Sequence, residues 1–205
     1  MKVKICGITR LEDALCCEKY GADAIGYIFF KGSKRYISPE NAGKISSRLS
    51  PFLVKTGVFV NEPANEINRI AKIAGLNAVQ LSGDETPELA EKIILPVIKG
   101  FRVKDDFNYA ILNNYKNCGF LLDSFNEKEY GGTGKTFNWE NIPAGMRGKI
   151  ILAGGISEEN IDLIVNEIKP AAVDISSSVE TAPGIKDENK IKTFMNKINS
   201  YRINL

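Results

Sequence analysis

The sequence predicts an α/β protein with a single domain, a (βα)8 (TIM) barrel that spans residues 1–205. Eight short apolar runs rich in β-forming residues alternate with longer segments of helical period, and no linker-like stretch interrupts them. Strands that alternate with helices pair in parallel through right-handed crossovers, and eight such units favour a closed barrel. The chain length of 205 residues suits this fold, whose range reaches down to about 200 residues.

The strands are expected where β-branched and aromatic residues gather in short apolar runs. These runs cover residues 3–6, 24–29, 54–60, 78–81, 96–101, 119–123, 150–153 and 172–175. An open doubly wound sheet is the alternative architecture. The first strand is followed by "CGITRLED", which lacks the G-x-G-x-x-G spacing of a dinucleotide site in such a sheet.

The helices are expected between these strands, at residues 11–20, 39–49, 64–74, 87–94, 106–113, 159–167 and 186–200. Ser38 followed by Pro39 is a start signal, and Gly21 and Gly75 follow the ends of predicted helices. The crossover after the sixth strand is the weakest, because "YGGTGKTFNWENI" favours at most a short turn around Trp139.

Composition argues against several classes of protein. The 27 basic and 25 acidic side chains leave a net charge of +2 and are interspersed, so no surface for nucleic acid or an anionic membrane is expected. No apolar run approaches the roughly 18 residues of a spanning helix, and the apolar stretch of "MKVKICG" is too short for a secretory signal. We therefore expect a cytoplasmic protein that binds neither nucleic acid nor membrane, whereas a small anionic ligand is compatible with its charge.

The chain has four cysteines, at positions 6, 16, 17 and 118, and no histidine. This spacing is not that of metal ligands, so no metal is expected, and reduced thiols fit a cytosolic protein. Cys16, Cys17 and Cys118 are interpreted as packing residues. Without histidine, another group has to move protons near neutral pH.

Cys6 and Asp123 are the candidates for proton transfer, because each ends a predicted strand where barrels carry their chemistry. A nearby cation, Lys4, is expected to lower the pKa of the thiol from its usual value of about 8.5 and so make a usable base. Desolvation by the preceding apolar run would raise the pKa of Asp123 and make it a proton donor. The alternative interpretations are a small buried residue for Cys6 and a helix cap or solvated carboxylate for Asp123.

Alternation along the strands predicts an ion pair inside the barrel. Lys4 and Cys6 share one face of the first strand, and Asp174 and Ser176 share one face of the last. The first and eighth strands are neighbours in a closed barrel. Lys4 and Asp174 are therefore expected to pair beneath the mouth.

The loops after the seventh and eighth strands predict a phosphate site. Barrels of this kind commonly hold phosphate there, on the N–H groups of a glycine-rich turn, hydroxyls and a helix N-terminus. The residues expected to contribute are Gly154 and Gly155 of "LAGGIS" and Ser177 and Ser178 of "DISSSVETAPGIKD". Ordinary turn glycines and serine caps are the alternative.

Two further loops suggest ligand contacts. "KGSKRYISPE" carries Arg35, whose guanidinium can clamp a second anionic group such as a carboxylate. The glycines of "YGGTGKTFNW" would let that loop fold over the mouth as a lid. A basic surface loop and a flexible connection are the alternatives.

Seven segments together resemble the phosphoribosylanthranilate isomerase family of tryptophan biosynthesis. They occur in the family's order and span nearly the whole chain: "KICGIT" at 4–9, "SKRYISPE" at 33–40, "GVFVNE" at 57–62, "VQLSG" at 79–83, "LLDS" with "GGTGKTFNW" at 121–139, "LAGGI" at 152–156, and "DISSSVE" with "PGIKD" at 174–187. The resemblance implies a single (βα)8 barrel. It also implies an Amadori rearrangement of a phosphorylated aminoaldose to an aminoketose, without metal or organic cofactor.

The resemblance further implies roles for individual residues. Asp123 would be the general acid that opens the ribose ring, and Cys6 the general base that takes the proton from C2. Arg35 would bind the anthranilate carboxylate, and Asp174 matches the family's strand-eight aspartate. The remaining substrate-binding residues implied are Gly7, Gln80, Gly154, Gly155, Ser177 and Ser178.

The chain departs from the family pattern at three positions. Ser82 replaces the usual histidine of "QLHG", Ser178 replaces the glycine of "SGVE", and Lys34 replaces the proline of "SPR". A thiamine-phosphate or indole-glycerol-phosphate synthase-like barrel, and a non-catalytic or different-substrate phosphate-binding barrel, stay open as alternatives. The sequence does not decide between a monomer and a homodimer.

Overall fold

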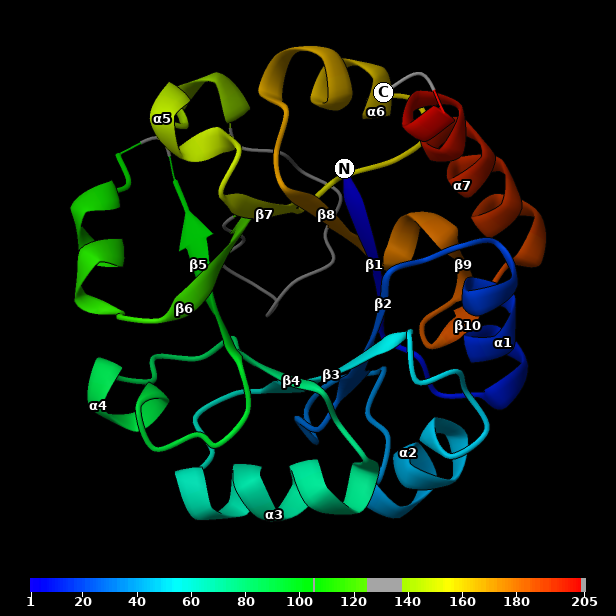
Figure 1. Ribbon diagram of the computed structural model, residues 1–205, viewed down its shortest axis with the longest axis vertical. Helices are drawn as coiled ribbons and strands as arrows, with labels where there is room; N and C mark the ends of the chain where they lie inside the picture. The colour runs from blue at the N-terminus through cyan, green and yellow to red at the C-terminus, as the bar shows by residue number, and fades with distance from the viewer. Residues whose placement is uncertain (105, 125–137, 204–205) are drawn as a thin grey trace.

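A computed structural model of the protein describes residues 1–104, 106–124 and 138–203. Eight parallel strands close into one barrel, in which β8 pairs with β1, and helices surround the ring of strands (Figure 1). The strands are β1 (Lys2–Cys6), β2 (Ala24–Ile28), β3 (Val54–Phe59), β4 (Ala78–Leu81), β5 (Val97–Val103), β6 (Cys118–Ser124), β7 (Ile150–Ala153) and β8 (Ala172–Ile175). The predicted fold and all eight strands are confirmed, with ends that move by one or two residues.

The helices are less regular than predicted. The α-helices are α1 (Leu11–Lys19), α2 (Pro39–Ser46), α3 (Ala64–Ala74), α4 (Pro87–Ala90), α5 (Ala144–Arg147), α6 (Ile161–Leu163) and α7 (Glu188–Ile203). Short turns complete the crossovers: the 3-10 turns η1 (Tyr109–Asn114), η2 (Trp139–Asn141) and η4 (Ser177–Val179), and the π turn η3 (Ile164–Ile168). The short turn expected around Trp139 is η2, and α5 was not predicted.

Three predicted helices differ from the structure. The helix expected at 87–94 ends at Ala90, the one at 106–113 is the 3-10 turn η1, and the one at 159–167 is a single α turn followed by the π turn η3. The π turn stops where Lys169 takes a left-handed conformation with φ of 55°. Pro170 follows Lys169, and proline disfavours a helical conformation in the residue before it.

Local signals explain the regular helices. Ser38 caps α2 by accepting a hydrogen bond from the Asn41 backbone N–H at 3.3 Å. The buried residues of α3 recur at helical spacing, and Gly75 closes that helix with φ of 63°. The core lies between the strands and this ring of helices.

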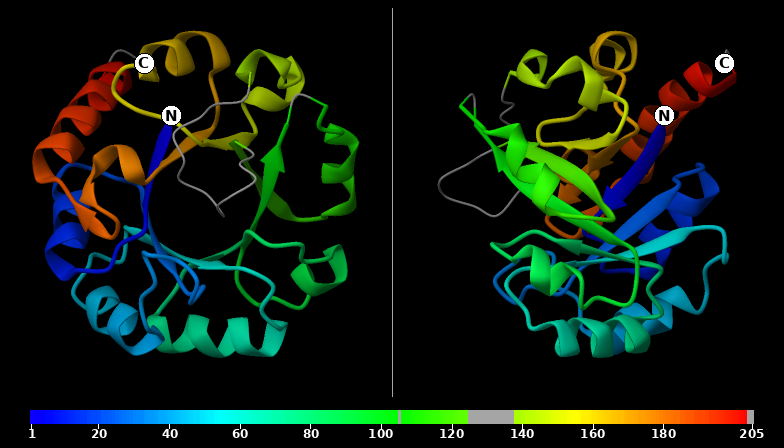
Figure 2. Two further views of the ribbon diagram at one scale, coloured as in Figure 1. Left: turned by 180° about the vertical axis from the view of Figure 1, so that it is seen from behind. Right: turned by 60° about the vertical axis from the view of Figure 1, so that its left-hand side comes forward.

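The two ends of the chain lie together. Helix α7 packs beside α1 (Figures 1 and 2), and Arg202 donates hydrogen bonds to the backbone carbonyl of Met1. Between β8 and α7, two short antiparallel strands, β9 (Glu180–Ala182) and β10 (Ile185–Lys186), form a small separate sheet. This pair was not predicted, because its residues do not alternate between apolar and polar. None of the described helices is long and apolar enough to cross a lipid bilayer.

A buried ion pair ties β5 to the loop after β4. The Lys99 Nζ donates to Glu85 Oε2 at 2.7 Å and to the Gly83 carbonyl at 2.7 Å, and both charged side chains are buried. Glu85 also accepts from the backbone N–H groups of Gly83 and Asn61. The carboxylate therefore fixes the start of one crossover against the neighbouring strand.

Replacing Glu85 with alanine is expected to lower the free energy of unfolding by about 3–5 kcal/mol, because it leaves the Lys99 charge buried and unpaired. Urea denaturation followed by circular dichroism measures this. Glu66→Ala is the matched control, since it removes an exposed ion pair with Arg69 of the same 2.7 Å length and is expected to change nothing measurable. Equal losses in the two variants would contradict the argument.

Candidate active site

A cavity of about 550 Å³ opens at the carboxyl ends of the barrel strands. Its lining includes nine of the ten residues that the sequence singled out: Cys6, Arg35, Gln80, Asp123, Gly154, Gly155, Asp174, Ser177 and Ser178. Residues from six strands and their following loops thus meet in one place, as the closed barrel requires. The loop expected to act as a lid lies outside the described residues between positions 130 and 137.

Gly7, the tenth predicted residue, is not among the residues that line the cavity, but its backbone conformation shapes the site. Its φ of 81° is left-handed. A Cβ atom there would lie 2.6 Å from Arg35 Cδ and 3.2 Å from Ser176 Oγ. Gly7 therefore lets the aliphatic stem of Arg35 cross directly over the chain next to Cys6.

The predicted ion pair beneath the mouth is present. Lys4 Nζ lies 2.7 Å from Asp174 Oδ2, and both side chains are buried. A Cβ atom at Gly26 would lie 2.6 Å from Cys6 Sγ and 3.1 Å from Lys4 Nζ. The thiol and the ammonium therefore both pack against the backbone of this glycine. Within the described part of the chain, Asp174 Oδ1 is buried without a hydrogen-bond partner.

The prediction that Lys4 lowers the pKa of Cys6 below its usual value is wrong. Burial raises the pKa of the thiol, and this effect exceeds the opposing stabilisation of the thiolate by Lys4. The charge of Asp174 raises the thiol pKa further. For Lys4, burial favours the neutral amine, but Asp174 and Cys6 outweigh it and raise the pKa of Lys4.

Asp123 lies on the opposite side of the ring. It is half-buried near the end of β6, in register with Arg102 of β5, and both side chains line the cavity. The cavity therefore has a thiol and a carboxyl group on different strands, with space between them.

Two loops bound the side of the cavity where phosphate binding was predicted. Gly154 and Gly155 follow β7 with φ values of 85° and 68°, a left-handed pair that favours glycine. Asn160 braces this turn, donating to the Gly155 carbonyl at 2.8 Å and accepting from the Ser157 N–H at 2.9 Å. After β8, the turn η4 buries Ser178 Oγ, which has no hydrogen-bond partner among the described residues.

Gln80 and Ser82 form a polar pair in the wall of the cavity. Gln80 Nε2 donates to Ser82 Oγ at 3.0 Å, and both residues line the cavity. Gln80 Oε1 is buried and has no partner in the described residues. The serine at position 82 therefore meets the glutamine amide and leaves its carbonyl available to a ligand.

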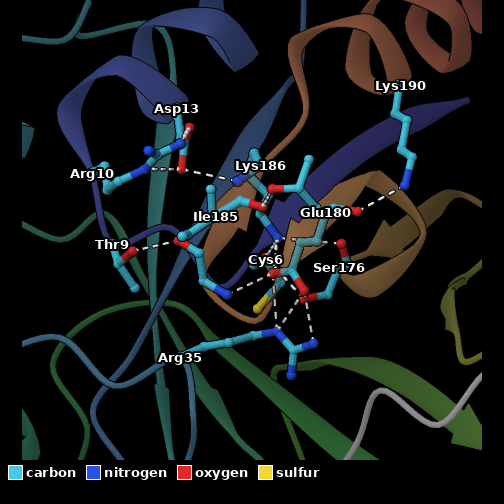
Figure 3. Close-up of polar contacts among 12 residues, drawn as sticks. Cys6, Thr9, Arg10, Asp13, Arg35, Ser176, Glu180, Ile185, Lys186 and Lys190 are labelled. Carbon is cyan, nitrogen blue, oxygen red and sulfur yellow. Dashed lines mark hydrogen bonds and ion pairs between the residues drawn. The ribbon is translucent and has the colours of Figure 1, made fainter.

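Sequence reasoning missed Glu180 and Lys186, which hold Arg35 and Cys6 (Figure 3). Glu180 accepts from Arg35 Nε at 3.0 Å and from Arg35 Nη2 at 2.8 Å. Lys186 Nζ donates to the Cys6 carbonyl at 2.6 Å and to Glu180 Oε1 at 2.8 Å. Both residues belong to segments that matched the family, "DISSSVE" and "PGIKD", but no role was predicted for Glu180 or Lys186 themselves.

No group of three or more cysteine, aspartate and glutamate residues that is arranged to hold a metal ion occurs in residues 1–104, 106–124 and 138–203. The cavity thus offers a thiol, carboxyl groups, a guanidinium, hydroxyls and a glycine turn. A (βα)8 barrel with such a cavity at its strand ends belongs to the class of barrels that act on small ligands at this face.

Comparison with known proteins identifies the family. A family model described as N-(5'phosphoribosyl)anthranilate (PRA) isomerase matches residues 3–197. The N-(5'-phosphoribosyl)anthranilate isomerase of Trichlorobacter lovleyi is 46% identical over 197 residues, which cover 95% of this chain and 96% of that protein. The chain therefore belongs to the phosphoribosylanthranilate isomerase family and is an isomerase of tryptophan biosynthesis.

Solved structures agree with this assignment. The phosphoribosyl anthranilate isomerase of Thermus thermophilus superposes with a TM-score of 0.90 at 39% identity, covering 98% of this chain and 100% of that chain. A second such isomerase, at 41% identity and a TM-score of 0.86, was solved in complex with reduced 1-(o-carboxyphenylamino)-1-deoxyribulose 5-phosphate, and the match covers 98% of this chain and 99% of that one. The family predicted from the sequence is confirmed.

Substitutions at Lys4 and Asp174 are expected to shift thiolate formation at Cys6 in opposite directions. In the unaltered protein the thiolate forms above its usual pH range, because burial raises the pKa of Cys6. Lys4→Met removes the cation that opposes burial, so alkylation by iodoacetamide needs a still higher pH. Asp174→Asn removes a negative charge, so alkylation begins at a lower pH.

Peptide mass spectrometry of samples alkylated between about pH 7 and 11 follows Cys6 separately, a range that brackets the usual thiol pKa of about 8.5. Cys118, at the opposite end of the barrel wall, is the internal control and should react alike in all variants. A Lys4→Met protein whose Cys6 reacts at the same pH as the unaltered protein would refute the assigned charge balance.

Proposed function

We propose that this protein catalyses the Amadori rearrangement of N-(5-phosphoribosyl)anthranilate to 1-(2-carboxyphenylamino)-1-deoxyribulose 5-phosphate, with Asp123 as general acid and Cys6 as general base. The observation that carries this proposal is the shared cavity. Cys6, Asp123, Arg35 and the loops after β7 and β8 all line it, in a chain of the isomerase family. The relative solved with the reduced aminoketose phosphate supports the same ligand class.

The first step opens the ribose ring. Asp123 donates its proton to the ring oxygen as the bond from that oxygen to C1 breaks, and the nitrogen lone pair forms a protonated Schiff base at C1. Asp123 leaves this step as a carboxylate. Its place near the end of β6, in the lining of the cavity, suits this role, because a ligand in the cavity can reach the carboxyl group.

The second step moves a proton from carbon. The Cys6 thiolate takes the proton from C2, and the electron pair of that bond neutralises the Schiff base and gives an enolamine, which tautomerises to the aminoketose. Cys6 then loses this proton and Asp123 regains one, so the cycle adds and removes no atoms. The raised pKa of Cys6 makes its thiolate scarce but more basic, which suits removal of a weakly acidic proton.

Binding would divide between the two anionic ends of the substrate. Arg35 is assigned to the anthranilate carboxylate, because a planar guanidinium suits that group. Gly154, Gly155, Ser177 and Ser178 are assigned to the phosphate, on the side of the cavity that barrels commonly use. Gln80 and Asp174, each with a buried oxygen that lacks a partner in the described chain, are assigned to donors on the ligand, such as hydroxyl groups.

The cytoplasm is the proposed place of action. All four cysteines are free thiols, the state typical of a reducing compartment.

Cys6→Ser and Asp123→Asn are each expected to lower kcat by at least about 100-fold, the range that positioned acid-base groups contribute. The fluorescence decay of phosphoribosylanthranilate, generated in place, measures the rate. Cys118→Ser is the control, because that thiol lies at the start of β6 and is expected to leave the rate unchanged. A Cys6→Ser protein at full activity would reject the thiol as base, and an inactive unaltered protein would reject the substrate.

A further inference from the structure

Glu180 joins two cations that belong to different parts of the fold. Its side chain is buried, and it pairs with Arg35 from the loop after β2 and with Lys186 of β10. Both of its carboxylate oxygens accept from the Arg35 guanidinium, at 3.0 Å and 2.8 Å, and the Gly184 N–H donates to it at 3.2 Å. Burial works against the charged carboxylate, but Arg35 and Lys186 overcome it and lower the pKa of Glu180. The carboxylate is therefore ionised at neutral pH.

Lys186 carries the connection to Cys6. Its buried ammonium donates to Glu180 Oε1 at 2.8 Å, to the Cys6 carbonyl at 2.6 Å and to the Ser176 carbonyl at 3.3 Å. Ser176 Oγ also donates to the Cys6 carbonyl, at 3.0 Å. The carbonyl of the last residue of β1 thus accepts hydrogen bonds from two donors, the Ser176 hydroxyl and the Lys186 ammonium (Figure 3).

The network is anchored outside the cavity as well. The Lys186 backbone N–H donates to Asp13 Oδ2 at 3.1 Å, and Asp13 is itself buried and paired with Arg10. Lys190 of α7 donates to the Glu180 carbonyl at 2.8 Å. These contacts tie the small β9–β10 sheet to α1 and α7. The carboxylate and the ammonium therefore have little freedom to move.

The same network orients the Arg35 guanidinium, whose stem lies against the residue after Cys6. Arg35 donates to Glu180 through both Nε and Nη2, which lie along one edge of the guanidinium. Two bonds along one edge fix the plane of the guanidinium. The stem of Arg35 crosses Gly7, the residue after Cys6, with no room for a Cβ atom between them. A shift of either residue is therefore transmitted to the other through a few rigid contacts.

We propose that Glu180 and Lys186 are positioning residues, whose ion pair holds the Arg35 guanidinium and the Cys6 backbone in one fixed relation. The inference rests on the proposed function, in which Arg35 receives the substrate carboxylate and Cys6 removes the proton at C2. Glu180 then acts on binding through Arg35, and Lys186 acts on the chemical step through Cys6. Misplacement of about 1 Å at such groups can cost on the order of 100-fold in rate.

A double-mutant cycle tests the Glu180 arm. Glu180→Gln, Arg35→Met and the double variant are assayed with phosphoribosylanthranilate, with the enzyme concentration raised until the decay is measurable. Glu180→Gln is expected to lower kcat/KM on the order of 10- to 100-fold, mainly by raising KM, and to raise KM no further once Arg35 is gone. A double variant whose fold-loss in kcat/KM equals the product of the two single losses would overturn the proposal.

Glu85→Gln is the matched control for loss of a buried carboxylate. It disrupts a lysine pair of similar length on another side of the barrel, at 2.7 Å. Whatever this variant costs in thermal stability, its effect on kcat/KM is expected to be the same with and without Arg35. Thermal unfolding of each variant identifies the temperature range in which all of them are folded.

The pH dependence of kcat tests the role of Lys186, because a residue that only stabilises the fold would leave this dependence unchanged. Lys186→Met is expected to lower kcat, and to shift the rise of kcat with pH to higher pH, because the Lys186 charge favours the Cys6 thiolate. Lys186→Arg keeps the charge and is expected to restore the pH profile. A Lys186→Met protein with reduced kcat but an unmoved profile would overturn the role.

The outcomes separate the two proposals. An unaltered protein that does not consume phosphoribosylanthranilate overturns the proposed function and this inference with it. An active unaltered protein whose Glu180→Gln loss is independent of Arg35 overturns the inference alone.

Discussion

The pairing of β8 with β1 is the constraint on which the site depends. This seam closes the barrel and brings residues from the two ends of the chain into contact, with Lys4 in register with Asp174. The ion pair between them lies under the cavity, and the Cys6 carbonyl receives hydrogen bonds from Ser176 and Lys186, which lie far along the chain. A barrel left open at this point would keep its individual strands but lose the environment of the thiol.

The positive charges at the seam lower the pKa of the Cys6 thiol, but burial raises it by more. Lys4 lies beside the Cys6 thiol, while Lys186 binds the carbonyl of the same residue. The two cations favour the thiolate, yet burial and the Asp174 carboxylate leave the pKa of Cys6 raised. The protein thus holds a neutral thiol whose conversion to thiolate costs less than it would in an apolar pocket. In the proposed mechanism, the thiolate of Cys6 is therefore scarce but strongly basic.

Sequence patterns predicted the strands well, because each strand is short, apolar and bounded by turn residues. The crossovers were harder. Apolar residues at 87–94 and 106–113 suggested helices, but the structure has a four-residue helix in the first range and a 3-10 turn in the second. Local propensity does not determine how far a helix can continue before the chain must return to the barrel. The β9–β10 pair depends on contacts with α1 and α7, which no local pattern records.

For the site as well, some residues and contacts were predicted from the sequence and others were missed. Residues at strand ends were found because the topology brings all such ends to one face, and the Lys4–Asp174 pair followed from alternation on neighbouring strands. The bond between Arg35 and Glu180 joins two loops distant in sequence, so it depends on how the loop after β8 folds. The direction of the Cys6 pKa was missed for a related reason. The sequence reveals the neighbouring lysine but not the depth at which both groups are buried.

Two departures from the family pattern change the cavity lining more than the backbone. Ser178 stands where the family commonly has glycine, yet the described non-glycine residues with positive φ are Asn61, Asn117 and Lys169, so the side chain brings no left-handed strain. Its hydroxyl is buried at the edge of the cavity. Ser82 places a second hydroxyl on the cavity wall, against Gln80. Both substitutions therefore change the polarity of the ligand surface, and they leave the side chains of Cys6, Asp123 and Glu180 themselves unaltered.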